Sequence, residues 1–274
     1  MDNFIDELKE TAIAAARLGG RILQEGFGTL TSDQIGLKGV GDYITDLDHR
    51  SEQRIIQEIR KKFPDHTIQA EESGEVKTGS PFRWIIDPLD GTTNYVQGIP
   101  IYSVSIAVTE NDQTRMGVVY YPDQDELFCA SKGKGAFLNG QRIQCSKKIS
   151  LEGAILSTGF PWRSKYAVTS YLNAFKEIFL KVDGMRRMGS AAIDLCYTAC
   201  GRYDGFWEMK LKPWDIAAGI LILQEAGGRV SDFIGRDDFF KSGDVVAANP
   251  QIHAELTAIT SIYLSEVHKN IPGE

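Results

Sequence analysis

The chain has 274 residues, of which 42% are hydrophobic and 24% are charged, and its formal net charge is -7. These values are typical of a globular protein that buries a sizeable core. The mild acidity argues against DNA or RNA as a main partner, because phosphate backbones select surfaces rich in lysine and arginine. No window of 18 apolar residues predicts a membrane span, and the opening residues MDNFIDELKE lack the features of an export signal. We therefore expect a cytoplasmic protein with no nucleic-acid and no membrane partner.

Two amphipathic helices are predicted at the start of the chain. Apolar residues recur at helical spacing over 4–23, and a second helix is expected over about 49–62. The stretch between them has little periodicity, which predicts a loop or a loose hairpin that carries Asp46 and Asp48. Long irregular connections of this kind are often functional. We expect the 28–48 loop to be mobile when no metal is bound.

Strands follow the second helix. The segments HTIQA at 66–70 and FRWIID at 82–87 are rich in strand-forming residues. From 101 to 145 the pattern is that of a meander of short strands, and Asn139-Gly140 is a strong signal for a hairpin turn.

From about residue 150 helices and strands alternate. Strands are predicted at 153–158, 203–208 and 244–250, and helices at 165–182, 189–201, 214–228 and from 251 onward. We interpret the chain as a single domain, 1–274, made of an α+β metal-binding lobe at 1–149 and an α/β substrate lobe at 150–274.

Acidic residues stand at four positions where strands end or helices begin: Glu71 and Glu72, Asp87 and Asp90, Asp215, and Asp46 with Asp48. Most of these have an ordinary explanation, because acidic residues are frequent in turns and at helix N-caps. The pair Asp87 and Asp90 is different, because it ends an apolar strand and precedes a Gly-Thr-Thr turn.

Carboxylates without cysteine or histidine partners favour a hard cation such as Mg²⁺. Two such ions can stabilise both the attacking and the leaving oxygen of a phosphate displacement. Gly91 tolerates backbone angles that other residues resist. The turn at Gly91, Thr92 and Thr93 could therefore open a short helix whose amide groups face an anion.

The chain resembles, over nearly its whole length, the inositol monophosphatase family of Mg²⁺-dependent, lithium-sensitive phosphatases. The resemblance is carried by EES at 71–73, WIIDPLDGTTNY at 84–95 and PWDIAAG at 213–219, with GKGAFLNG at 133–140 between the last two. It implies a fold of the α/β (α+β) class, a layered α/β/α/β/α sandwich of the inositol monophosphatase and fructose-1,6-bisphosphatase type, and a homodimer.

The resemblance also implies the metal ligands. Glu71, Asp87 and the backbone carbonyl of Leu89 would hold the first Mg²⁺ ion, and Asp87, Asp90 and Asp215 would hold the second. A third, weaker ion would be bound partly through Glu71, so that the site takes two or three ions.

Catalytic and substrate-binding roles follow from the same resemblance. Glu71, Thr92 and Asp48 would activate the attacking water, with Asp48 hydrogen-bonded to Thr92. The substrate would contact Asp90, Gly91, Thr92, Gly189, Ser190, Ala191, Glu208 and Asp215. The implied reaction is hydrolysis of myo-inositol monophosphate by in-line attack of metal-activated water, without a phosphoenzyme.

Three alternatives remain open. Lys210 and Lys212 stand where the family usually has a histidine or small residues, which leaves room for fructose 1,6-bisphosphate, NADP or adenosine bisphosphate as the substrate. A non-catalytic regulatory role is the second, because some bacterial relatives associate with the transcription machinery. An aspartyl-phosphate mechanism of the haloacid-dehalogenase type is the third, but it would need a nucleophile where this chain has Pro88.

The pair Arg186-Arg187 is interpreted as a surface or dimer-interface pair rather than as a phosphate contact.

Overall fold

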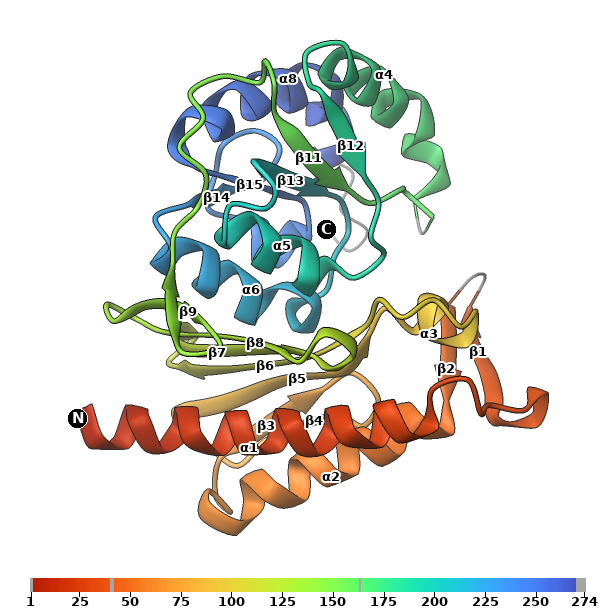
Figure 1. Ribbon diagram of the computed structural model, residues 1–274, viewed down its shortest axis with the longest axis vertical. Helices are drawn as coiled ribbons and strands as arrows, with labels where there is room; N and C mark the ends of the chain where they lie inside the picture. Colours follow the sequence, from red (N-terminus) through yellow and green to blue (C-terminus); the bar gives the residue numbers. More distant parts are fainter. Residues whose placement is uncertain (1, 40–41, 163, 270–274) are drawn as a thin grey trace.

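Five layers, alternately helical and β-sheet, make up the computed structural model, which describes residues 2–39, 42–162 and 164–269 (Figure 1). The outer helical layers are α1 (Asp2–Gly26) with α2 (Asp46–Lys62), and α4 (Val168–Phe179) with α8 (Pro250–Lys269). Between the two sheets lie α5 (Ala191–Ala199) and α6 (Pro213–Glu225). This is the layered α/β/α/β/α sandwich that the family resemblance implied. No helix in the described ranges is long and apolar enough to cross a bilayer.

The first sheet has eight strands in the order β10-β9-β8-β7-β6-β5-β3-β4. Their bounds are β3 (Thr67–Ala70), β4 (Gly74–Val76), β5 (Phe82–Asp90), β6 (Ser103–Glu110), β7 (Gln113–Tyr121), β8 (Glu126–Ser131), β9 (Gly135–Leu138) and β10 (Gln141–Ile143). Only β3 and β5 pair in parallel within the described sheet. The predicted hairpin joins β9 to β10, and Asn139 and Gly140 both have positive φ (48° and 79°), as a two-residue hairpin turn requires.

The second sheet has five strands in the order β12-β11-β13-β15-β14. Their bounds are β11 (Ile155–Thr158), β12 (Gly184–Arg186), β13 (Gly205–Glu208), β14 (Arg229–Ser231) and β15 (Val245–Ala248). Strand β11 runs parallel to both β12 and β13. The sequence analysis missed β4, β14 and the one-turn helix α7 (Phe239–Ser242), because segments of three or four residues are too short to show a period.

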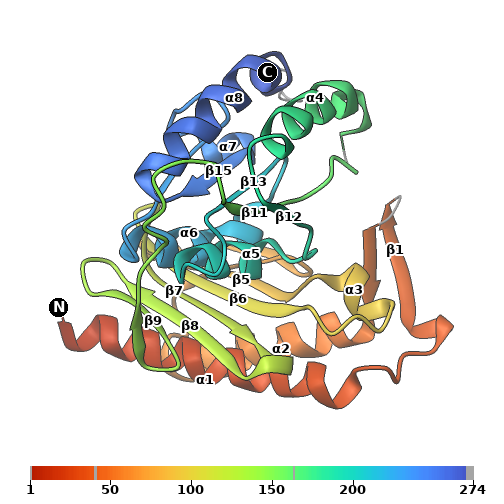
Figure 2. The same cartoon turned by 45° about the horizontal axis from the view of Figure 1, so that its top comes forward.

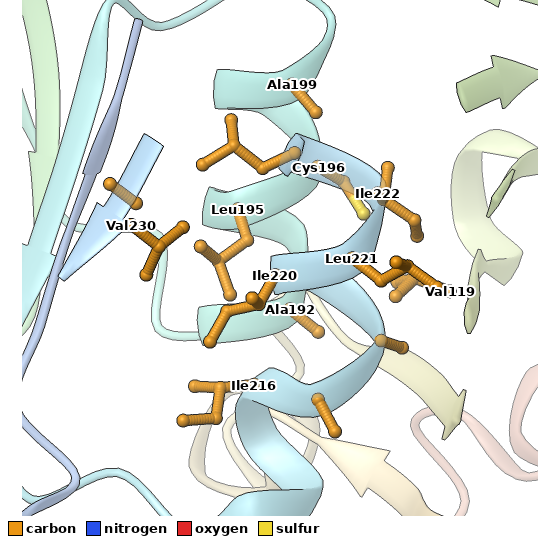
Figure 3. Close-up of a cluster of buried hydrophobic side chains, with 14 of the residues drawn as sticks. Val119, Ala192, Leu195, Cys196, Ala199, Ile216, Ile220, Leu221, Ile222 and Val230 are labelled. Carbon is orange, nitrogen blue, oxygen red and sulfur yellow. The ribbon is translucent and has the colours of Figure 1, made fainter. Parts of the chain in front are cut away.

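The central helices α5 and α6 are apolar on nearly every side, because each is covered by a sheet and by the other helix (Figure 3). Their packing is close enough to require glycine at the contacts. A Cβ at Gly219 would lie 2.7 Å from the Cβ of Leu195, and one at Gly117 on β7 would lie 2.8 Å from the carbonyl oxygen of Ala218. This core joins residues from both halves of the chain, and the division into two lobes at residue 149 stays a prediction.

The start of α2 differs from the prediction. The expected loose hairpin is formed by β1 (Ile35–Gly39) and β2 (Asp42–Thr45), but α2 begins at Asp46 rather than near 49, so Asp46 and Asp48 are helical. The cause is a capping box. The Thr45 hydroxyl accepts from the amide of Leu47 at 3.1 Å, while Asp48 Oδ2 accepts from the amide of Thr45 at 2.8 Å. Residues 40–41 lie outside the described residues, and mobility of the 28–48 loop stays a prediction.

Candidate active site

One pocket collects most of the residues that the sequence singled out. Its lining includes Glu71, Asp87, Leu89, Asp90, Gly91, Thr92, Gly189, Ala191, Glu208 and Asp215. They come from the turn after β3, the end of β5, the short helix α3 (Thr92–Val96), the segment before α5, the end of β13 and the first turn of α6. Figure 2 shows α3 beside the β1–β2 hairpin at one end of the first sheet. Two predicted site residues, Asp48 and Ser190, lie outside this lining.

A β-bulge aims both aspartates of β5 at the pocket. Residues three apart on a regular strand point to opposite faces. Here Asp87 pairs with Ser105 and Asp90 pairs with Ser103, so three steps on β5 match two steps on β6. The extra residue returns Asp90 to the face that Asp87 occupies. Pro88 lies within this irregularity, which is where a central strand tolerates a residue that lacks an amide proton.

Negative charge dominates the pocket. Burial, followed by the charges of Glu71, Asp90 and Asp215, raises the pKa of Asp87 well above its usual value. Burial also raises the pKa of Asp90, although hydrogen bonds from Ser190 and Ala192 oppose the rise. A cation among these groups would relieve their repulsion and favour their ionised forms.

The donor chemistry of the pocket fits a hard cation. Its lining carries the carboxylates of Glu71, Asp87, Asp90, Glu208 and Asp215 and, among the described residues, no cysteine or histidine, which suits Mg²⁺. In the described part of the chain, however, no three Asp, Glu, His or Cys side chains converge tightly enough to enclose an ion. The acids are thus gathered in one pocket but do not form a closed cage.

A lysine of the β1–β2 hairpin partly neutralises this charge. Lys38 Nζ lies 3.0 Å from Glu71 Oε1 and 2.6 Å from Glu72 Oε1. Burial, opposed by Lys38, raises the pKa of Glu72 to about 7. Lys38 is therefore paired with both glutamates of the EES turn.

Glu52 of α2 fixes the backbone of the EES turn, and the sequence analysis did not identify it. Its two carboxylate oxygens accept the amide protons of Glu72 and Ser73, both at 2.9 Å. The residue is only 2% exposed. The sequence did contain a signal for this role: Glu52 lies one turn before Ile55 on the buried face of α2. An acidic residue on an apolar stripe needs buried hydrogen-bond partners.

Asp48 lies directly behind Thr92. It is 1% exposed, and the Thr45 hydroxyl donates to its Oδ2 at 2.6 Å. Burial raises the pKa of Asp48 to about 6, although the bonds from Thr45 oppose the rise. The expected contact with Thr92 is present but long, at 3.4 Å, whereas the Thr92 hydroxyl reaches the carbonyl of Leu89 at 2.9 Å. Asp48 therefore stands on a capped helix start and not on the predicted loop.

Ser190 lies behind the pocket lining, against Asp90. It is 1% exposed and caps α5, and its hydroxyl donates to Asp90 Oδ2 at 2.5 Å while accepting from the amide of Ile193 at 3.3 Å. The amide of Ala192 reaches the same Asp90 oxygen at 2.8 Å. The hydroxyl of Ser190 thus orients Asp90, and its direct contact with substrate stays a prediction.

The rest of the lining consists of Tyr43, Thr93, Phe160, Pro161, Trp162, Ser164, Arg187, Met209, Lys210 and Leu211. The sequence analysis had placed only Thr93 and Lys210 of this set near the site. Arg187, interpreted from the sequence as a surface or interface residue, lines the pocket, because β12 carries it to the end of β11. Lys210 also lines it, but its ammonium group lies 3.5 Å from the buried Asp244. No local pattern marks these residues, since they meet only through the order of the strands.

Comparisons with known proteins agree with one another. The model of the inositol monophosphatase family matches residues 5–264. The Nus factor SuhB of Escherichia coli K12 is 44% identical over 259 residues, which are 94% of this chain and 97% of that protein. The structure of the extragenic suppressor protein suhB of Bartonella henselae superposes with a TM-score of 0.90 at 40% identity, over 93% of this chain and 98% of that one. An IMPase of Thermotoga maritima gives a TM-score of 0.86 at 36% identity, over 97% and 100% of the two chains.

Proposed function

The chain belongs to the inositol monophosphatase family, and from this premise we propose that it is a Mg²⁺-dependent phosphatase of phosphate monoesters, with myo-inositol monophosphate as the first candidate substrate. The observation that supports this most directly is the meeting of Glu71, Asp87, Asp90 and Asp215 in one pocket. These residues are separated by up to 144 positions in the chain, from Glu71 to Asp215, so chance does not readily bring them together.

The carboxylates of Glu71, Asp87, Asp90 and Asp215, with the carbonyl of Leu89, would hold two or three Mg²⁺ ions. When bound, the ions would lower the pKa of a water molecule and neutralise charge on the phosphoryl oxygens. The residues named here are oriented in advance. The amide of Leu89 donates to Asp87 Oδ1 at 3.0 Å, and the amide of Lys212 donates to Asp215 Oδ2 at 2.7 Å.

Thr92 would position the attacking water. Its hydroxyl proton lies between two acceptors, the carbonyl of Leu89 at 2.9 Å and Asp48 Oδ1 at 3.4 Å, and with either acceptor its oxygen can accept a hydrogen bond from water. Glu71 and Asp48 would complete the group, Asp48 acting through Thr92. The amides of Gly91 and Thr92 would contact the phosphate. Attack in line with the leaving oxygen would then release the alcohol and inorganic phosphate without a phosphoenzyme.

Asp90 and Asp215 would also contact the substrate. Glu208, Gly189 and Ala191 line the pocket where the alcohol would lie, whereas the contribution of Ser190 would pass through Asp90. We place the enzyme in the cytoplasm as a homodimer that takes a small phosphorylated substrate.

A phosphate-release assay tests the proposal. Inositol 1-phosphate, fructose 1,6-bisphosphate and NADP would be compared with Mg²⁺ and with excess EDTA. We expect hydrolysis only with the metal, and a loss of at least about a hundredfold in Asp90→Asn and Asp215→Asn with the circular dichroism spectrum unchanged. Asp112→Asn is the matched control, because its side chain is 80% exposed and is not part of the pocket lining. Full turnover in EDTA would refute the metal requirement.

A regulatory role is the second candidate, because relatives that are 44% identical are named Nus factors. Such a role would qualify the expectation that nucleic acid plays no part. The two functions separate genetically. If Asp90→Asn replaces a bacterial relative in a deletion strain as well as the unaltered chain does, the cellular role does not depend on turnover; if it fails while remaining folded, the phosphatase activity accounts for that role.

A further inference from the structure

The β13–α6 turn, residues 209–212, lies between two acids of the site. Glu208 is the last residue of β13, and Asp215 lies in the first turn of α6. Three residues of the turn, Met209, Lys210 and Leu211, line the pocket themselves. The conformation of the turn therefore helps to set how the two carboxylates lie relative to each other, yet the proposed chemistry gives the turn no role.

The backbone of this turn is strained at Lys210. Its φ is +59°, in the left-handed region that residues with a Cβ rarely adopt. Five described residues other than glycine have a positive φ, and the other four are all asparagine or aspartate, the types that tolerate this region best. A lysine keeps such a conformation only where its surroundings impose it, and strain of this kind is concentrated at functional sites.

The segment that follows α7 imposes this conformation. Asp244 is fully buried, and its Oδ1 accepts from the amide of Lys210 at 3.3 Å. The ammonium group of Lys210 lies 3.5 Å from the same oxygen and donates to the carbonyl of Ser242 at 3.4 Å. Asp244 therefore contacts Lys210 both at its backbone and at the end of its side chain.

The next residue of the turn packs against the same segment. The amide of Leu211 donates to the carbonyl of Gly243 at 2.8 Å. Gly243 has a φ of +71°, and a Cβ at this position would overlap the carbonyl oxygen of Leu211, so the two backbones are in direct contact. These contacts continue the pairing of β13 with β15, in which Glu208 is opposite Val245.

The acids at both ends of the turn have little freedom to move independently of it. A Cβ at Gly159 would overlap the carboxylate of Glu208, which shows how closely that side chain packs. At the other end, the amide of Lys212 donates to Asp215 Oδ2 at 2.7 Å, and the amide of Asp215 donates to the carbonyl of Lys212 at 3.1 Å. A shift of Lys212 would therefore move the carboxylate of Asp215.

We propose that Asp244 is a positioning residue of the active site, which acts through Lys210 to hold the strained β13–α6 turn. The turn then sets where Glu208 and Asp215 stand in the pocket. The inference rests on the proposed function for what these two acids bind, whereas the hold of Asp244 on the turn is a property of the chain itself. It also assigns the charge of Lys210 to Asp244 and not to the substrate.

Mg²⁺ affinity from calorimetry and KM from phosphate release measure this role. Asp244→Ala should weaken Mg²⁺ binding about tenfold, as loss of groups behind metal ligands commonly does, and should raise KM, with kcat largely recovered at saturating Mg²⁺. Asp244→Asn should restore part of the loss, because its amide oxygen can still accept from the amide of Lys210. If Asp244→Ala does not fold, Asp244→Asn is compared with the unaltered chain in its place.

Glycine at position 210 gives the sharpest test, because glycine adopts a positive φ without strain. Lys210→Gly/Asp244→Asn removes the ion pair but lets the turn keep its conformation, so its Mg²⁺ affinity should stay close to that of the unaltered chain. Lys210→Ala/Asp244→Asn also removes the pair but keeps the strain, and it should lose about tenfold. Equal losses in the two double variants would overturn the proposal.

Asp204→Ala is the matched control. Asp204 directly precedes β13, at the end opposite Glu208, and it is 6% exposed, lies 3.2 Å from the ammonium group of Lys148 and does not line the pocket. Its loss should lower the stability of the protein and leave Mg²⁺ affinity unchanged. A loss of affinity equal to that of Asp244→Ala would show that general destabilisation is the cause, and would overturn the proposal.

Amide hydrogen exchange of the metal-free protein keeps this inference separate from the phosphatase proposal. Asp244→Ala should speed exchange at the amides of Leu211 and Lys212 about tenfold, whereas Asp204→Ala should not. Faster exchange confined to this turn supports the positioning role even if no substrate is hydrolysed. Unchanged exchange there refutes the role even if hydrolysis is found.

Discussion

Replacing Ser190 with alanine tests whether its hydroxyl serves the fold or the substrate. The change removes an N-cap bond to the amide of Ile193 and a hydrogen bond to Asp90 at 2.5 Å. Loss of an N-cap serine costs about 1 kcal/mol, and a hydrogen bond to a charged group contributes about 1.5–3 kcal/mol. Because Asp90 keeps the amide of Ala192, we expect a total loss of about 2 kcal/mol in the free energy of unfolding.

Urea denaturation followed by circular dichroism measures this loss. With a slope of about 2–3 kcal/mol per M, the midpoint should fall by about 1 M. Ser190→Gly separates the two contributions, since glycine at an N-cap costs only a few tenths of a kcal/mol and the Asp90 bond is lost in both variants. An unchanged urea midpoint in Ser190→Ala, together with a raised KM for the substrate, would refute this reasoning. It would favour instead the direct contact between Ser190 and the alcohol part of the substrate that the family resemblance implied.

Three further predictions concern other positions. Gly91→Ala should destabilise the protein by about 1–2 kcal/mol in thermal denaturation and lower phosphate release, because φ is +95° and the new Cβ would lie 2.8 Å from the carbonyl oxygen of Ile101; an unchanged melting temperature would contradict this. Glu52→Ala should lower the free energy of unfolding by about 2–3 kcal/mol and weaken Mg²⁺ binding in calorimetry, since two buried amides lose their acceptor. Unaltered metal affinity would show that the EES turn keeps its conformation without Glu52. Burial lowers the pKa of His253 to about 4, so between pH 6.5 and 4 the unfolded chain binds a proton that the native state does not, and the free energy of unfolding should fall as the pH decreases through that window. The variant His253→Gln should show a weaker dependence of stability on pH. Parallel curves of stability against pH for the two proteins would exclude His253 as the source.

The motifs that carry the family resemblance were sufficient for the layered fold class and for most of the acidic residues, whereas the hydrophobic pattern alone gave the long helices and the meander. Long helices and the meander were visible because they repeat a period over many residues. Asp87 and Asp90 were recognisable because an apolar strand rarely ends in two acids before Gly-Thr-Thr. The two residues are three positions apart, which on a regular strand would place them on opposite faces. Only the pairing with β6 showed that a bulge returns both to one face.

Tertiary structure decided what surrounds those acids. Glu52 and Lys38 reach the EES turn from elements 20 and 33 positions away, and Arg187 joins Trp162 only because β12 and β11 are parallel neighbours. Local patterns record which way a side chain points along its own helix or strand, but they do not record which strand ends share an edge. The acidic residues of the pocket were therefore predictable from the sequence, whereas the rest of its lining depends on the order in which the strands assemble.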